Sequence, residues 1–291
     1  MIFHKLFFVL IFGMMFLGYS CSPKQPSQKD ILSQNVDFLI LKGNEFWEKR
    51  ANPENAKWAR NFLFKAHQMR PQDKETGLLY SRSCFFAGKY IVESDSKKDS
   101  LFMEGALTAL FYILNISPKE INSETILNPG EGRHLLMDKI ESTDKTSLPA
   151  LYLWGLNLGE YIFSKPVRDR MKQKDLLESL FYRIHNLDPT YDFGGSLHLL
   201  GVLYSRIPGM DVKQAKTYFD RAIQMYPDCF SHRTARAEFY FIKTGHREAF
   251  HDELSQVLKQ DPTQIPDIMP ENLMEQGRAK ILLERESSLF E

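Results

Sequence analysis

Apolar residues recur along this chain with the 3.6-residue period of amphipathic helices, and no run shows the sustained alternation that is typical of strands. The clearest unit contains two such helical stretches. Its small, apolar and terminating positions are Leu197, Leu200, Gly201, Tyr204, Ala215, Phe219, Ala222 and Pro227. The unit therefore predicts two helices joined by a turn, with a proline just beyond the second.

The spacing of these positions matches a tetratricopeptide hairpin with two additional residues in the turn. Gly201, Ala215 and Ala222 are small enough to let two antiparallel helices approach closely. Pro227 is expected to end the second helix, because proline lacks an amide hydrogen and clashes with the preceding turn.

The second half of this unit recurs four more times, each copy carrying three apolar positions and a closing proline. The copies are Ala59, Leu63, Ala66 and Pro71; Ala106, Leu110, Ile113 and Pro118; Leu177, Phe181, Ile184 and Pro189; and Phe250, Leu254, Val257 and Pro262. Matching first helices are expected over residues 36–47, 76–90, 149–163 and 233–241. We predict an all-α fold, an array of tetratricopeptide-like hairpins that forms an α-α superhelix or a closed helical bundle. The irregular hairpin lengths favour a closed or strongly curved array.

Two segments depart from the repeat. Residues 119–147 contain a turn at 128–132 and a short predicted helix over 133–140. After Pro262 the pattern predicts a last helix over about 272–287, which would cap the final hairpin as repeat arrays require. Residues 34–291 are thus expected to form a single domain.

The amino terminus has the pattern of an export signal. Lys5 precedes a run of twelve largely apolar residues, 6–17. Twelve helical residues rise about 18 Å, which is too short for a hydrocarbon core of about 30 Å. Cys21 follows Gly18 and Ser20 and resembles the acylated cysteine of a lipobox, although the position three before it is usually aliphatic. We predict a lipoprotein signal peptide over 1–20, lipid attachment at Cys21 and a flexible tether over 21–33. Ordinary signal peptidase cleavage is the alternative.

Charge and reactive residues exclude several functions. The 37 Lys and Arg residues balance 37 Asp and Glu residues, which argues against nucleic acid as a partner. Cys84 and Cys229 lie beside aromatic residues and are expected to be buried free thiols, with one disulfide as the alternative. His246 and His251 project about 140° apart on a helix and cannot share a metal ion. We predict no catalytic or metal-binding residues, no cofactor and no enzymatic activity.

Aromatic residues concentrate in the third hairpin, at Tyr152, Trp154, Tyr161 and Phe163, and again in the fifth. Core packing accounts for many of them, and the alternative is a groove or channel for an apolar ligand or a partner helix. Tyr152 and Trp154 lie on different faces of their helix. At least one of them is therefore expected to face a neighbouring element or a cavity.

Several segments of the carboxy-terminal half carry a further pattern. They are Leu151-Tyr152-Leu153-Trp154-Gly155, Leu187 to Gly195, Leu200-Gly201-Val202-Leu203-Tyr204, Pro208-Gly209, and Asn272-x3-Gln276-x-Arg278-Ala279-x2-Leu282-Leu283. From about residue 148 onward the chain resembles the TatT family, the T-component lipoproteins of tripartite ATP-independent periplasmic (TRAP) transporters. The last segment is the most diagnostic, because a generic tetratricopeptide helix does not require Asn, Gln and Arg at those places.

The resemblance implies a lipid-anchored protein of the cell envelope that faces the periplasm. It implies assembly, as a homotrimer, with the solute-binding P component of the transporter, and a channel through each protomer for a hydrophobic solute. The rival function is a tetratricopeptide scaffold lipoprotein for envelope assembly without a transport role.

The resemblance also proposes ligand- or partner-binding residues. It places Tyr152 and Trp154 on the aromatic helix of the family, and Asn272, Gln276 and Arg278 on its closing helix. Hydrogen bonding to the loose ends of the preceding hairpin is the alternative interpretation of the last three. Leu156 and Leu158 occupy positions that are often Ala, which indicates a narrower or closed channel.

Overall fold

The computed structural model describes residues 28–114, 122–127 and 131–291. Within these ranges every regular element is helical, so the all-α prediction is confirmed. The predicted signal peptide, Cys21 and residues 128–130 of the predicted turn lie outside the described residues.

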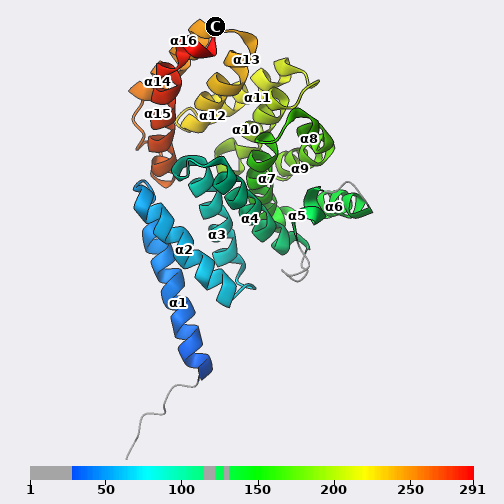
Figure 1. Cartoon of the computed structure of the whole chain (residues 1–291), viewed down its shortest axis with the longest axis vertical. Helices are drawn as coiled ribbons and strands as arrows, with labels where there is room; N and C mark the ends of the chain where they lie inside the picture. The colour runs from blue at the N-terminus through cyan, green and yellow to red at the C-terminus, as the bar shows by residue number, and fades with distance from the viewer. Residues whose placement is uncertain (1–27, 115–121, 128–130) are drawn as a thin grey trace, which may run out of the picture.

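The helices pair into antiparallel hairpins that follow one another along the chain (Figure 1). The first three hairpins are α1 (Gln28–Trp47) with α2 (Pro53–Met69), α3 (Lys74–Phe86) and its extension η1 (Ala87–Ile91) with α4 (Asp95–Leu114), and α7 (Leu148–Phe163) with α9 (Lys174–Leu187). The fourth is α10 (Tyr191–Arg206) with α11 (Val212–Met225). The fifth joins α12 (Phe230–Ala235), η3 (Arg236–Phe241) and α13 (Ile242–Thr244) to α14 (Arg247–Lys259).

Shorter elements connect or cap these hairpins. They are α5 (Ser123–Leu127), α6 (Glu131–Ser142), η2 (Lys145–Ser147), α8 (Val167–Lys172), η4 (Pro266–Ile268), α15 (Met269–Glu284) and α16 (Glu286–Leu289). The helix expected over 133–140 is present as α6, and the expected capping helix is present as α15 and α16. The first helix begins at Gln28 and not near residue 36, so the expected tether over 21–33 is helical from that residue onward.

The closing prolines act as predicted. Helices α2, α9 and α11 each end two residues before their proline, at Met69, Leu187 and Met225, and α14 ends three residues before Pro262. Pro118 lies outside the described residues. Proline thus sets the length of the second helix in each hairpin where it is described.

Close packing inside a hairpin depends on small residues. A Cβ atom on Gly201 of α10 would lie 2.7 Å from the ring of Phe219 on α11. Phe219, Ala215 and Ala222 are fully buried. The ring occupies the space that a side chain at position 201 would need, as the repeat pattern predicted.

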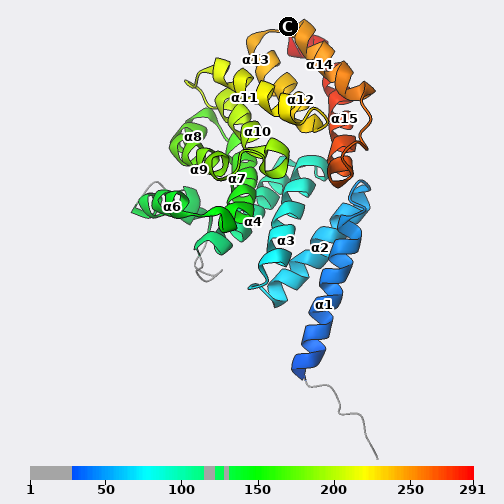
Figure 2. The same cartoon turned by 180° about the vertical axis from the view of Figure 1, so that it is seen from behind.

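The array curves until its last helix meets its first hairpin. In Figures 1 and 2 the start of α15 lies beside the α1–α2 turn. Arg50 of that turn donates from Nε and a terminal nitrogen to the two carboxylate oxygens of Glu271, at 2.9 and 2.8 Å, and also to the Asp267 carbonyl at 2.7 Å. None of the helices in the described ranges combines the length and apolar content that a membrane span needs.

Replacing Gly201 tests the packing inside the hairpin. Gly201→Ala should destabilise the protein by about 1–3 kcal/mol in urea unfolding, because the new methyl group overlaps the Phe219 ring. Gly277→Ala is the matched control, since nothing lies within 4 Å of a Cβ atom there. That variant should be stabilised by about 0.5–1 kcal/mol, as expected for Gly to Ala in an exposed helix. Equal effects at the two positions would contradict the packing account.

Candidate functional site

A cavity of about 310 Å³ lies where the closed array brings distant helices together. We call it the central cavity. Its walls come from α1, α3, η1, α7, α10, α12, η4 and α15. The apolar part of the wall consists of Trp47, Phe85, Phe86, Leu156, Phe193 and Ile268. The first hairpin and the last helix both contribute, so the cavity exists because the array closes.

Two arginines at this cavity are paired with carboxylates. Arg50 is held by Glu271, and its guanidinium lies 4.5 Å from the centre of the Trp47 ring. Arg82 donates to Asp192 at 2.9 Å, and burial together with the charge of Asp192 raises the pKa of Tyr152 well above its usual value. Paired charges attract a ligand ion less strongly than free ones do, so the cavity favours apolar contacts over ion binding.

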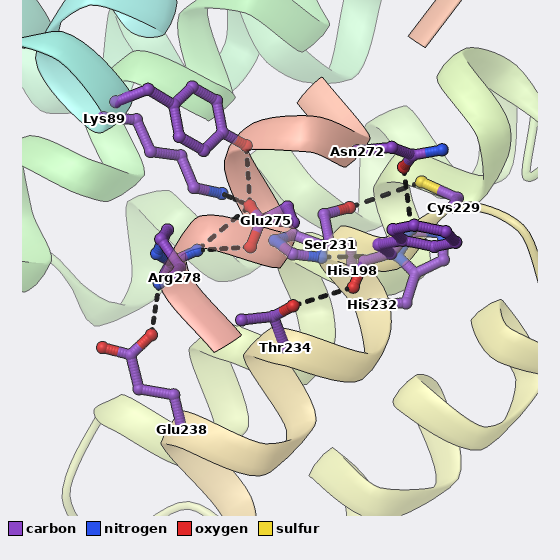
Figure 3. A network of polar contacts seen from close by, with 12 residues as sticks. Lys89, His198, Cys229, Ser231, His232, Thr234, Glu238, Asn272, Glu275 and Arg278 are labelled. Atoms are coloured by element: carbon purple, nitrogen blue, oxygen red, sulfur yellow. Dashed lines mark hydrogen bonds and ion pairs between the residues drawn. The ribbon is translucent and has the colours of Figure 1, made fainter. Parts of the chain in front are cut away.

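Behind one wall lies a buried carboxylate, Glu275 of α15, with no exposed surface (Figure 3). Arg278 donates to its two oxygens at 3.0 and 2.8 Å, and Tyr90 donates at 2.7 Å. The Lys89 ammonium lies 3.4 Å away, and Arg278 also pairs with Glu238. Burial by itself raises the pKa of Glu275, but Arg278, Lys89 and the Tyr90 hydrogen bond outweigh it and lower the pKa to about 2. The carboxylate is therefore ionised at neutral pH.

Two π-helical segments supply partners to this network. Lys89 and Tyr90 lie on η1, and Glu238 lies on η3. A π-helical turn inserts an extra residue and rotates the side chains that follow it, and such turns are frequent at functional sites. Both distortions adjoin the pair formed by Glu275 and Arg278, which indicates that the backbone is adapted to this network.

A strained turn at the start of α10 also lines the central cavity. Asp192, Phe193 and Gly194 all have left-handed backbone angles, with φ of 50°, 57° and 73°. Left-handed angles at two residues with side chains cost of order 1–3 kcal/mol each and persist only where surrounding contacts impose them. Here the contacts are the ion pair of Asp192 with Arg82 and a hydrogen bond to the Phe193 carbonyl.

That second contact comes from a pair of buried histidines. Nε2 of His232 lies 2.8 Å from the Phe193 carbonyl oxygen, which only accepts, so Nε2 carries the proton. Nδ1 of His232 then accepts from Nδ1–H of His198 at 3.3 Å. Burial lowers the pKa of both rings, and nearby positive charge at Lys89 lowers them further, to about 4 for His232. Both rings are therefore neutral at pH 7.

The structure separates the two aromatic residues singled out by sequence. Tyr152 lines the central cavity, where its ring leaves no room for a side chain at Gly195. Trp154 is 1% exposed within the core, and its indole N–H has no hydrogen-bond partner among the described residues. One faces a cavity, as expected, and the other packs in the core. Leu156 also lines the cavity, whereas Leu158 is fully buried.

The polar residues of the closing helix bind the ends of neighbouring helices. Asn272 donates to the carbonyls of Asp228 and Pro262, at 2.9 and 3.3 Å, and accepts from the amide of Phe230 at 3.1 Å. Gln276 donates to the carbonyls of Val257 and Gln260 at the end of α14, at 3.1 and 2.9 Å. The hydrogen-bonding interpretation thus describes the contacts of Asn272 and Gln276, whereas Arg278 pairs with the carboxylates of Glu275 and Glu238. Asn272 in addition lines the central cavity.

Sequence reasoning missed Lys89, Tyr90, Glu275, the two histidines and the strained turn. Only Asp192 and its neighbouring glycines carried a signal, as part of the family pattern. A glutamate in an amphipathic helix is ordinarily expected to be exposed, so the sequence gives no sign that Glu275 is buried.

Two further findings concern the cysteines and possible metal ligands. Cys84 and Cys229 are buried free thiols, as predicted, and burial raises the pKa of each to about 12. Such thiols are inert at neutral pH. Within the described ranges no cluster of three or more His, Cys, Asp or Glu residues is arranged to hold a metal ion.

Comparison with known families gives one match. The model of the TRAP transporter T-component family matches residues 122–290, more than half of the 291-residue chain. The matched segment includes α7, the strained turn and α15, whereas the first two hairpins lie before it. No curated protein matches the chain.

The buried histidines predict a stability that falls in mild acid. Their folded-state pKa values lie below the unfolded value near 6.5, so the unfolded chain binds more protons as the pH falls from about 6.5 towards 4. Stability is present above pH 6.5 and is lost over that range. Between pH 7 and 4.5 the free energy of unfolding should fall by about 2 kcal/mol less in His232→Gln than in the unmodified protein. Urea unfolding at both pH values measures the difference.

His134→Gln is the control, because His134 is exposed on α6. That variant should keep the pH dependence of the unmodified protein. The same pH dependence in His232→Gln as in the control would refute the role assigned to the buried pair.

Proposed function

Because this chain belongs to the TRAP transporter T-component family, we propose that it is a membrane-tethered accessory subunit of a TRAP-type solute uptake system. The family match over residues 122–290 carries the proposal. The subunit holds the solute-binding P component of the transporter near the membrane and passes a hydrophobic solute to it. It acts without enzymatic chemistry and as a homo-oligomer, a trimer by family resemblance.

The central cavity supports the solute part of the proposal. Its volume of about 310 Å³ falls within the range of small-molecule sites, and aromatic side chains form much of its wall. Tyr152 and Asn272 contribute to that wall and are proposed to contact the solute. Trp154, Gln276 and Arg278 would act indirectly, by supporting the helices that form the wall.

The predicted lipid attachment at Cys21 supports the proposed location at a membrane surface. An acylated Cys21 would stand seven positions before Gln28, the first residue of α1. A fully extended chain of that length spans at most about 25 Å. The amino-terminal end of α1 would therefore lie close to a membrane surface, with the body facing the periplasm.

Two measurements test the proposal. In the first, the protein is captured from native membranes under mild detergent and the proteins bound to it are identified. In the second, binding of a neutral naphthylamine dye to the protein is measured. The unmodified protein should capture a solute-binding protein and bind the dye. Leu156→Trp should retain the protein partner but bind the dye at least tenfold more weakly, because the larger ring fills the cavity.

Leu273→Trp is the matched control, since Leu273 lies on the exposed face of α15 outside the cavity. It should capture the partner and bind the dye normally. Failure to capture a solute-binding protein that is expressed in the same cells would count against the proposal. Capture of outer-membrane assembly proteins in its place would favour the rival scaffold function. The neighbouring genes also distinguish the two: permease and P-component genes are expected beside the coding gene, and envelope-assembly genes would favour the scaffold.

A further inference from the structure

A second cavity, of about 300 Å³, lies on the other side of the Glu275 network. Its wall includes Phe102, Ser164, Arg206, Glu238 and Arg278, and it is more polar than the central cavity. Lys89 borders both cavities. The two spaces are therefore neighbours, divided at this side chain.

The dividing layer is the part of the network in Figure 3 that surrounds Glu275. Tyr90 faces the central cavity, Arg278 and Glu238 face the second cavity, and Glu275 between them lines neither. Ion pairs and hydrogen bonds join these side chains into one continuous layer. We call this layer, made of Lys89, Tyr90, Glu238, Glu275 and Arg278, the partition.

Of the three side chains that pair with Glu275, Lys89 makes the longest contact. Its ammonium lies 3.4 Å from a carboxylate that Arg278 and Tyr90 already satisfy at 2.7 to 3.0 Å. Removing Lys89 therefore leaves Glu275 paired. Its stem is flexible, and the ammonium also rests against the rings of Phe85 and Tyr90, 5.4 and 5.3 Å from their centres.

We propose that Lys89 is the movable part of the partition, and that its displacement joins the two cavities into one continuous passage. Glu275, Arg278 and Tyr90 remain in place as the fixed frame of that passage. The physiological meaning rests on the proposed solute-binding function, because a solute is what would use the passage. The geometry of the passage is tested without any solute.

The test is cross-linking through the partition. Ile268→Cys and Ser164→Cys introduce one thiol in the wall of each cavity, in a chain that also carries Cys21→Ser. Cys229, which lines the central cavity, is replaced by Ser in the same chain, and Cys84 is fully buried and reacts slowly because burial raises its pKa to about 12. A series of short flexible bis-maleimides is applied, and peptides that join the two introduced thiols are quantified by mass spectrometry.

Adding Lys89→Ala should raise the yield of joined peptides at least tenfold over the background chain. Lys89→Met, which keeps the length but removes the ammonium, should also raise it, to a smaller extent. Lys98→Ala is the matched control, because Lys98 lines the second cavity outside the partition, and it should give the background yield.

Two results would overturn the proposal. The first is efficient cross-linking in the background chain, which would show that the cavities are already joined. The second is background yield in both Lys89 variants although a monofunctional maleimide labels both introduced thiols, which would show that another group separates the cavities. If Lys89→Ala raises the cross-linking yield but the unmodified protein binds no dye, the passage is supported and the proposed hydrophobic solute is rejected.

Discussion

The fold depends on burying one carboxylate. An ionised side chain without exposed surface is tolerated only when donors surround it, and Glu275 finds them on two different parts of the chain. Arg278 comes from its own helix, whereas Tyr90 and Lys89 come from the second hairpin. Glu275 is therefore satisfied only when α15 lies against η1. This requirement brings the end of the array back to its beginning.

Closure in turn creates the space inside the molecule. The central cavity is bounded by the first hairpin on one side and by α15 on the other, and the pair of Arg50 with Glu271 fixes their approach. The π-helical turns and the left-handed turn at Asp192 are the local adjustments that aim side chains at the same region. Backbone distortion, buried charge and cavity thus coincide, as they do in many functional sites.

The sequence predicted the features that depend on the helical period of apolar residues. It did not predict the features that form only when the array of hairpins closes. The hairpins, their prolines and the close approach at Gly201 follow from neighbouring residues, and all three are present in the described helices. Helical spacing likewise placed Tyr152 and Trp154 on different faces. Glu275 and Lys89 are ordinary helical residues until segments about 190 positions apart meet, and the histidine pair until segments 34 positions apart meet. The tether was predicted to extend to residue 33 because the polar residues there show no apolar periodicity. Helix α1 nevertheless includes these residues from Gln28 onward.

The central claim is that the buried charge of Glu275 holds the array closed, and hydrogen exchange of Glu275→Gln tests it most directly. The amide keeps the shape of the side chain but removes the charge that Arg278 and Lys89 pair with. The account predicts faster exchange of the amides in η1 and α15, with exchange in α10 and α11 unchanged. Unchanged protection of η1 and α15 in this variant would contradict it.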